Sequence, residues 1–362
     1  MRSVRICRLL RRLPGKGIRD ERRLAGRRPC LQLSAEEKNM HLTDLQKQLC
    51  NILQDGLPVC PRPFLEVAKL LENYEQMVLQ QTAELKKAGV IRRLGAIINH
   101  KAIGMAATLV TAHVPQEKLQ EIADAVNLLE GVSHNYLREH HHNLWFTLQG
   151  NCPEEIESAL SNLSSRFGID FHSLPVERAF KLYVRFSAER GGQFTGETAE
   201  KPNGETVELN EVQKSILLKL QNELQVVAKP FDFLCGDGLD EKEVLKVIAD
   251  MNDKGVIRRI GAVVDHYKLG FVSNVLFVCK VAQEKIAEAG RKLACAGTVS
   301  HCYQRKTFEH WPYNLFAMMH GRNMDEIRQT ISKFVEEEKI ESYELLPTAA
   351  ELKKQPVNYP FD

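Results

Sequence analysis

The stretch GVIRRLGAIINH, from Gly89 to His100, recurs as GVIRRIGAVVDH, from Gly255 to His266. Eight of the twelve positions are identical, and the copies lie 166 residues apart. SHNYLR at 133–138 matches SHCYQR at 300–305, and later pairs keep the same order with an offset that drifts only to 172. A repeat of this kind predicts two homologous halves, over about 41–187 and 208–352.

The composition is ordinary for a globular protein. The chain has 362 residues, of which 43% are hydrophobic and 27% charged, enough for two or more domains with proper cores. No apolar run approaches the roughly 18 residues that span a bilayer, so no membrane segment is predicted. None of the nine cysteines forms a CxxC pair, which excludes a zinc ribbon or a thioredoxin motif. Scattered cysteines favour a reducing compartment, and we expect a cytoplasmic protein.

The positive charge is concentrated at the N-terminus. Residues 1–33 hold ten Arg and one Lys against Asp20 and Glu21, a net charge of +9 that leaves −7 for the remainder. We expect residues 1–39 to be a disordered extension, with the natural start at Met40; an organelle transit peptide is the alternative. The acidic body lacks the positive field that non-specific nucleic-acid binding requires.

Each half begins with a predicted winged helix-turn-helix, over 40–100 and 208–266. In the first, Leu42, Leu45, Leu49 and Ile52 have helical spacing. A second helix follows Pro63, and a third runs from about 75 to 88 and ends at Gly89. The alternating VIRRLGAII then predicts a β-ribbon, the wing. In the second half, Gly236 and Gly238 disfavour a regular middle helix.

Each half continues with strand, helix, strand, strand, helix, strand, the order of a ferredoxin-like fold, over 101–187 and 267–352. The predicted last strands are 169–177 and 340–347. The fold class is therefore α+β: a tandem repeat of winged helix-turn-helix and ferredoxin-like βαββαβ domains. A flexible linker is expected at 188–207 and a tail at 353–362. One face of each sheet needs a cover, which the other copy supplies, so the chain predicts an intramolecular pseudo-dimer and leaves room for a higher oligomer.

DNA binding is disfavoured. The predicted reading helices 75–88 and 241–254 have net charges of 0 and −1, whereas helices that contact phosphates and bases carry Lys or Arg. The repeated pairs Arg92-Arg93 and Arg258-Arg259 lie on the wings instead. We expect the winged helices to serve packing and dimerisation.

The residues that indicate chemistry form two sets on predicted strands. His301, Tyr303 and Arg305 alternate, so they share one face at steps of about 7 Å. His134, Tyr136 and Arg138 repeat the pattern in the first half. A core strand would carry aliphatic residues there, so both sets, called the trios below, are candidate site residues. A single histidine would more often be a structural residue.

Aromatic residues surround the second trio in the sequence. Trp311, Tyr313, Phe316 and Trp145 are either sheet packing or apolar walls for a large flat ligand. His320 ends the following strand and could reach the same face. One of His140, His141 and His142 could serve the pocket, and we take His140; three consecutive residues on a strand cannot all bind one ion, so no metal site is predicted. His100 and His266 end the wings and are expected to be structural.

These motifs carry a resemblance to a known family. GVIRRLGAIINH, VSHNYLREHHHNLWFTL, GVIRRIGAVVDH and VSHCYQRKTFEHWPYNLFAMMH together resemble siroheme decarboxylase, a family related to the AsnC/Lrp regulators, over 41–352. The first half is similar to one subunit type and the second to its partner. The wing motif alone would fit any AsnC/Lrp regulator, whereas the motif around His301 would not.

The resemblance implies removal of CO2 from the C12 and C18 acetate side chains of sirohaem in haem or haem d1 biosynthesis. Sirohaem would be the substrate, with no cofactor beyond that iron tetrapyrrole. His301 is the first candidate for the proton donor and His134 the second, with Tyr303 and Arg305 beside them. The expected substrate-binding residues are Arg138, Tyr136, Arg258, Arg259, Arg92, Arg93, Trp311, Tyr313, His320, His140 and Trp145. A ligand-sensing transcription regulator and a porphyrin carrier without chemistry are the alternatives.

Overall fold

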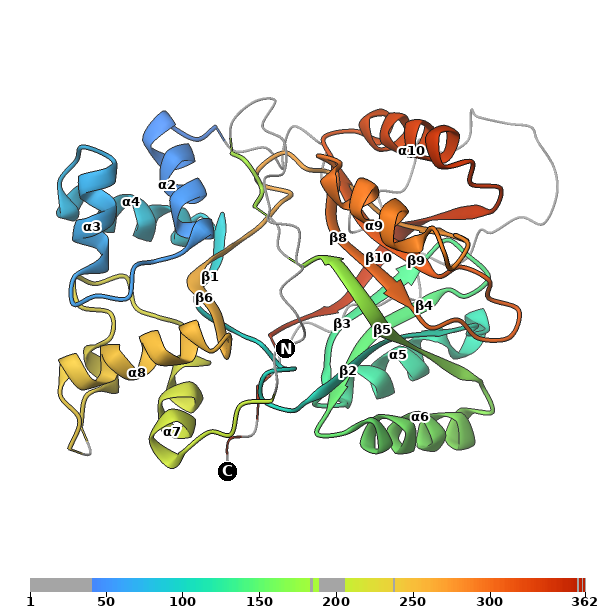
Figure 1. Cartoon of the computed structure of the whole chain (residues 1–362), viewed down its shortest axis with the longest axis horizontal. Coiled ribbons are helices and arrows are strands. Elements are labelled where there is room, and N and C mark those ends of the chain that lie inside the picture. Colours follow the sequence, from blue (N-terminus) through green and yellow to red (C-terminus); the bar gives the residue numbers. More distant parts are fainter. Residues whose placement is uncertain are drawn as a thin grey trace.

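The computed structural model describes residues 41–182, 185–188, 206–236, 238–356, 358–359 and 361. The predicted N-terminal extension and most of the predicted linker lie outside these residues. Two lobes are visible in Figure 1, with the winged helices on the left and the remaining strands and helices on the right. Among the described residues, no helix is both long and apolar enough to cross a membrane.

The helices of the first lobe follow the predicted pattern. In the first half they are α2 (Asp44–Asp55), α3 (Pro63–Leu70) and α4 (Glu75–Lys87). Thr43 and Gln46 form the capping box that begins α2. The second half has α7 (Glu211–Leu220) and α8 (Glu241–Asp253), but only the short 3₁₀ turn η3 (Asp232–Leu234) between them. The glycines that follow this turn explain why no regular middle helix forms.

The predicted wings differ from a ribbon within each half. Each half contributes one strand, β1 (Ile91–Ile98) or β6 (Ile257–Val264), and the two strands pair with each other antiparallel. Gly95 lies directly opposite Gly261 in this pairing, so the two copies of the opening motif meet at their equivalent residues. The repeated motif therefore joins the two halves. Alternation along one strand does not predict this pairing, because it does not specify the partner strand.

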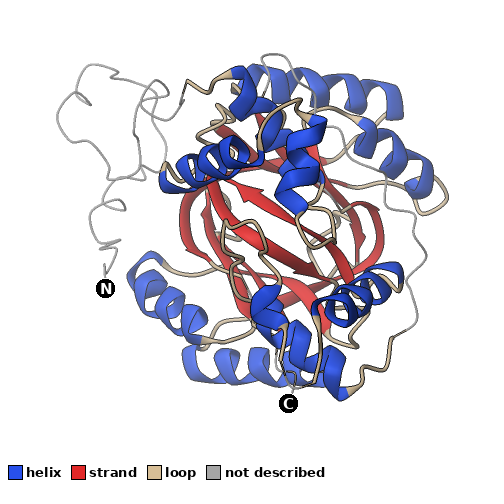
Figure 2. Cartoon of the chain, turned by 90° about the vertical axis from the view of Figure 1, so that its left-hand side faces the viewer, coloured by secondary structure: helices blue, strands red, loops and turns tan. Residues whose placement is uncertain are grey.

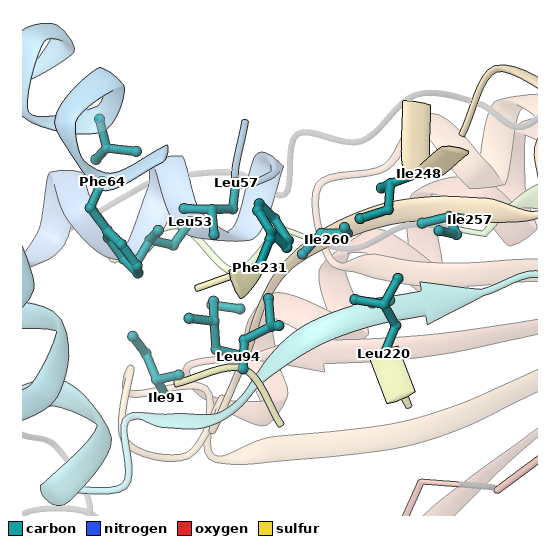
Figure 3. Close-up of a cluster of buried hydrophobic side chains, with 14 of the residues drawn as sticks. Leu53, Leu57, Phe64, Ile91, Leu94, Leu220, Phe231, Ile248, Ile257 and Ile260 are labelled. Carbon is teal, nitrogen blue, oxygen red and sulfur yellow. The ribbon is translucent and has the colours of Figure 1, made fainter. Parts of the chain in front are cut away.

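One hydrophobic core supports both winged helices. Its buried residues come from both halves, and Figure 3 shows side chains of the first half, among them Leu53, Phe64 and Leu94, packed beside Phe231 and Ile260 of the second. The main-chain N–H of Leu57 also donates to the Ile260 carbonyl. Because the apolar surface of each copy is buried against the other, the two winged helices form one folding unit.

The second lobe contains the two ferredoxin-like repeats. The first has β2 (Ala106–Ala112), η2 (Gln116–Lys118), α5 (Leu119–Leu128), β3 (Val132–Arg138), β4 (Leu144–Gly150), α6 (Pro153–Phe167) and β5 (Phe171–Lys181). The second has β7 (Ser273–Cys279), α9 (Ile286–Cys295), β8 (Val299–Arg305), β9 (Leu315–Gly321), α10 (Met324–Glu338) and β10 (Tyr343–Lys354). This order confirms the predicted βαββαβ repeats.

The last strand of each repeat crosses into the other half. β5 and β10 run on to Lys181 and Lys354, past their predicted ends at 177 and 347. The additional residues pair β5 with β8 and β10 with β3. The strands consequently close into one barrel, in the order β10-β3-β4-β2-β5-β8-β9-β7. Closure removes the exposed strand edges that two separate sheets would keep.

The barrel has an apolar exterior covered by helices and an interior shared by both halves. One buried cluster packs beneath α5 and α6, and another beneath α9 and α10, and Figure 2 shows helices above and below the strands. A third cluster lies between the sheets and includes Trp145 and Leu174 of the first half with Leu276, Phe316 and Leu346 of the second. Each repeat thus covers the free sheet face of the other.

The paired glycines of the ribbon offer a matched stability test. A Cβ on Gly261 would lie 2.5 Å from the Leu53 carbonyl oxygen, whereas a Cβ on Gly95 would first meet the flexible end of Arg93, at 2.9 Å. We expect Gly261→Ala to lower the free energy of unfolding by about 1–3 kcal/mol, the usual cost of overpacking, and Gly95→Ala to cost less. Thermal unfolding of both variants measures the difference; equal losses would contradict the packing argument.

Candidate active site

The two trios face the interior of the barrel. On β3, Asn135 donates to Asn127 of α5 and Leu137 joins the core beneath the helices. Strand alternation therefore directs the intervening His134, Tyr136 and Arg138 to the opposite, interior face. On β8, Cys302 lies in the core beneath α9 and α10, so His301, Tyr303 and Arg305 also face inward. The shared face that the sequence predicts for each trio is present.

The arginines of the trios are held by the crossing strands. Arg138 donates to the Leu346 carbonyl of β10 at 2.8 Å, and Arg305 donates to the Leu174 carbonyl of β5 at 2.7 Å. The guanidinium groups lie over the rings of Tyr136 and Tyr303, at 5.5 and 4.9 Å from their centroids. Among the described residues, the Nε of each arginine is buried without a hydrogen-bond partner. Each guanidinium can therefore donate a further hydrogen bond to an anionic ligand.

Burial keeps the trio histidines neutral. The Nδ1 atoms of His134 and His301 lie 2.8 and 3.2 Å from the hydroxyls of the preceding serines. Burial, with Lys354 and Arg92 nearby, lowers the pKa of His134 to about 4. Burial, followed by His134 and then Arg258, lowers the pKa of His301 to about 4. The two imidazoles are thus close enough to influence each other and are uncharged at neutral pH in the ligand-free protein.

Two further histidines lie near the trios, since His301 and Arg138 both act electrostatically on His320. The rings of His266 and His320 are 4.8 Å apart. Burial lowers the pKa of His266 to about 3 and that of His320 well below its usual value. His320 was predicted as a site residue, but His266 was expected to be structural. The structure places His266 with the site, and the signal that could have shown this is its position at the end of the repeated RR motif.

The paired arginines of the ribbon have different surroundings. Arg93 donates to the Gln221 carbonyl at the end of α7 at 2.8 Å, and Arg259 donates to the Gln54 carbonyl in the last turn of α2. Cations at helix C-termini stabilise the helix ends, so these two arginines hold the winged helices together. Arg92 and Arg258 are exposed, and their charges lower the pKa of His134 and His301. Only one arginine of each pair therefore lies toward the trios.

The aromatic residues form a packed layer inside the barrel. Trp145 and Trp311 are 1% and 2% exposed and contact each other at 5.5 Å between ring centroids. Trp311 also contacts Phe316, whose ring lies beneath the Arg305 guanidinium at 5.8 Å. Both tryptophans are buried against other side chains next to the trios. The structure therefore favours sheet packing over the alternative role of walls for a flat ligand.

Tyr313 and His140 contact this layer from Trp311. Their rings lie 5.0 and 5.7 Å from that of Trp311, and the Tyr313 hydroxyl donates to Glu344 at 3.3 Å. In the part of the chain that the structure describes, no side-chain hydrogen bond or ring contact joins either residue to the trios. Within the same residues, no group of three or more His, Cys, Asp or Glu has the arrangement of a metal site.

Family models match most of the chain. An AsnC-like ligand-binding domain matches residues 102–181 and 268–353, and the HTH domain of siroheme decarboxylase NirDL-like proteins matches residues 46–92. The siroheme decarboxylase of Hydrogenobacter thermophilus is 34% identical over 321 residues, which cover 86% of this chain and 94% of the relative. The chain belongs to the siroheme decarboxylase family.

Fusion of two subunits explains the repeat in this family member. The alpha subunit of the Desulfovibrio desulfuricans siroheme decarboxylase is 39% identical over 154 residues, which cover 42% of this chain and 89% of that subunit. A crystal structure of the siroheme decarboxylase NirDL covers 87% of this chain and 94% of its own, with a TM-score of 0.67 and 32% identity. A second structure, in complex with an iron-uroporphyrin III analogue, has a TM-score of 0.66 and 31% identity.

The buried histidines predict an acid-sensitive ligand-free protein. The pKa values of His134 and His301 fall from 6.5 to about 4, and that of His266 to about 3. Below pH 6.5 the unfolded chain therefore binds more protons than the folded chain, and the free energy of unfolding falls as pH drops from about 6.5 to about 4. Denaturant unfolding across this range measures the slope. His266→Gln should reduce the slope, and an unchanged slope would contradict the assignment.

Proposed function

We propose that this chain is a siroheme decarboxylase that removes CO2 from the C12 and C18 acetate side chains of sirohaem and yields didecarboxysirohaem. The observation that carries the proposal is the pair of His-Tyr-Arg trios, each half-buried on the inner face of the barrel and each with a buried arginine Nε that lacks a partner among the described residues. The family membership supports the same substrate class.

Substrate carboxylates would be bound by the cations of the site. Arg138 and Arg305 are fixed by main-chain carbonyls, so a carboxylate that binds them needs little side-chain ordering. Arg92 and Arg258 come from the ribbon and would bind carboxylates on the side of the ligand nearest the winged helices. The tyrosines beneath the guanidiniums supply flat apolar surface suited to a macrocycle.

The proposed chemistry uses one proton for each CO2 released. His301, or Tyr303 beside it, assists protonation of the pyrrole system. The bond between the acetate methylene and its carboxylate then breaks, and its electron pair remains on the methylene carbon and the macrocycle while CO2 departs. Protonation of that carbon gives a methyl group, and the proton on the pyrrole system returns to the side chain that donated it, so one proton is consumed for each CO2. Burial favours the step because a poorly solvated carboxylate loses less on becoming neutral CO2.

The low pKa of His301 is compatible with this role. In the ligand-free chain its pKa is about 4, first through burial and then through neighbouring His134 and Arg258. A bound carboxylate opposes the positive charge of Arg258 and favours the protonated imidazole. We therefore propose that substrate binding loads the proton on His301, with His134 as the second donor. No cofactor is proposed beyond the iron tetrapyrrole, because the macrocycle accepts the electrons.

A DNA-binding role is not proposed. The net charges of 0 and −1 on residues 75–88 and 241–254 give no positive reading surface. Arg93 and Arg259 are engaged with helix ends. The described cysteines are free thiols, which agrees with our proposal that the chain acts in a reducing compartment such as the cytoplasm.

The direct experiment is anaerobic incubation of the purified full chain with sirohaem, followed by mass analysis. Loss of two CO2 is expected, with the monodecarboxylated species as an intermediate. A gel-shift assay with promoter DNA on the same preparation tests the regulator alternative. A DNA shift without CO2 release would overturn the proposal, and tight sirohaem binding without CO2 release would indicate a carrier.

His301→Gln separates chemistry from binding. The variant keeps a polar side chain of similar length but cannot donate a proton from an imidazolium, so we expect kcat to fall about 10²–10⁴-fold, the usual contribution of a general acid. The dissociation constant for sirohaem, measured by absorbance titration, should change little. Unchanged CO2 release would remove His301 from the mechanism.

The two arginines of the second ribbon motif should respond oppositely to the same substitution. Arg258→Gln removes a charge near His301, so we expect a higher KM and an almost unchanged melting temperature. Arg259→Gln removes the contact with the α2 end, so we expect a lower melting temperature and an almost unchanged KM in the folded fraction. The reverse pattern would contradict the division of roles.

A further inference from the structure

The two trios differ in the strand that lies opposite them. On β10, Thr348, Glu351 and Lys354 stand opposite Arg138, Tyr136 and His134, respectively. On β5, Val176 and Ala179 stand opposite Arg305 and Tyr303. Directly opposed residues of paired strands share a face. Polar residues, including one ion pair, thus accompany the first trio, whereas small or apolar residues accompany the second.

The Lys354 ammonium is paired with Glu351 and acts on His134, the histidine of the first trio. It lies 3.2 Å from the Glu351 carboxylate, and both side chains are partly buried. Its positive charge lowers the pKa values of His134, His266 and His320. Because Lys354 stands opposite His134 in the strand pairing, its side chain lies on the side of the strand where the ligand of the proposed function would be.

Glu351 occupies the same region with the opposite charge. Its carboxylate raises the pKa values of Tyr136 and Tyr267, after the larger effect of burial. A groove of about 400 Å³ is also lined by residues 351–355 together with Asn127. Both members of the ion pair line this groove, where a ligand carboxylate could reach them.

A partly solvated ion pair is weak enough for exchange. Such pairs contribute about 0–1 kcal/mol to stability, so a second carboxylate that also contacts the neighbouring cations can replace Glu351 at little cost. Arg92 and Arg138 supply those cations, because both act electrostatically on Tyr136. The exchange would leave the Lys354 ammonium paired throughout.

We propose that Lys354 binds a side-chain carboxylate of the tetrapyrrole in the first half-site, and that Glu351 is the counter-ion that this carboxylate displaces. The inference rests on the proposed function, which it deepens by making the two half-sites unequal. The first half-site has an additional exchangeable ion pair, whereas the second has Ala179 at the place of Glu351 and Val176 at the place of Thr348. The first half-site consequently holds one carboxylate of the macrocycle more tightly than the second does.

The test compares charge-removing variants of the full chain with sirohaem as the probe. Lys354→Gln should raise the dissociation constant and KM about tenfold, a loss of about 1.4 kcal/mol in binding, and should change kcat by less than about threefold. Lys354→Arg should restore most of the affinity. Glu351→Gln removes the competing carboxylate and should lower the dissociation constant.

Lys353 provides the matched control. It is the adjacent lysine, but its Nζ donates to the Asn127 and Leu129 carbonyls on the helix side of β10. Lys353→Gln should leave the dissociation constant unchanged. An equal loss of affinity in Lys353→Gln and Lys354→Gln would show a general charge or folding effect and would overturn the inference.

Opposite effects of the two substitutions on the dissociation constant would exclude a purely structural ion pair. If the pair only anchors β10, Glu351→Gln and Lys354→Gln will both lower the melting temperature, and their effects on the dissociation constant will not be opposite. That result overturns the inference but leaves the proposed function intact when the wild-type chain releases CO2. If the wild-type chain binds sirohaem without CO2 release, the proposed function fails, while the dissociation constants still test Lys354.

Discussion

The pairing of the last strand of each repeat with a strand of the other half is the interaction on which the rest of the structure depends. β5 pairs with β8 and β10 pairs with β3, so the last strand of each repeat covers the free sheet edge of the other. Closure satisfies the main-chain donors and acceptors of what would otherwise be sheet edges. It also brings the Leu174 and Leu346 carbonyls to Arg305 and Arg138. The same pairing that stabilises the barrel therefore positions the guanidinium groups of the site.

Buried charge within the barrel has a cost that the fold only partly offsets. Burial lowers the pKa values of Arg138 and Arg305 to about 10, and those of His134 and His301 to about 4. The arginines remain charged and keep one unpartnered Nε each among the described residues, while the histidines stay neutral. An interior of this kind favours anionic ligands, since carboxylates supply the missing partners.

Several features of the site follow from local sequence rules. Alternation along β3 and β8 places the members of each trio on one face, and Gly89 ends the helix before the ribbon as expected. The same alternation could have separated Arg92 from Arg93, because neighbouring residues on a strand face opposite sides. The place of His266 beside His320, and the extension of β10 that carries Glu351 and Lys354, depend on contacts between distant segments.

The sequence by itself determined the duplication, the α+β order of the elements in each half and the shared face of each trio, because these depend on self-similarity and on periods of two or 3.6 residues along one segment. Tertiary structure decided that the wings pair with each other, that the sheets close into one barrel and that only Arg92 and Arg258 lie toward the trios. The physical reason is that strand register and partner choice are set by the closure of the whole sheet. No local pattern specifies which of several compatible edges will meet.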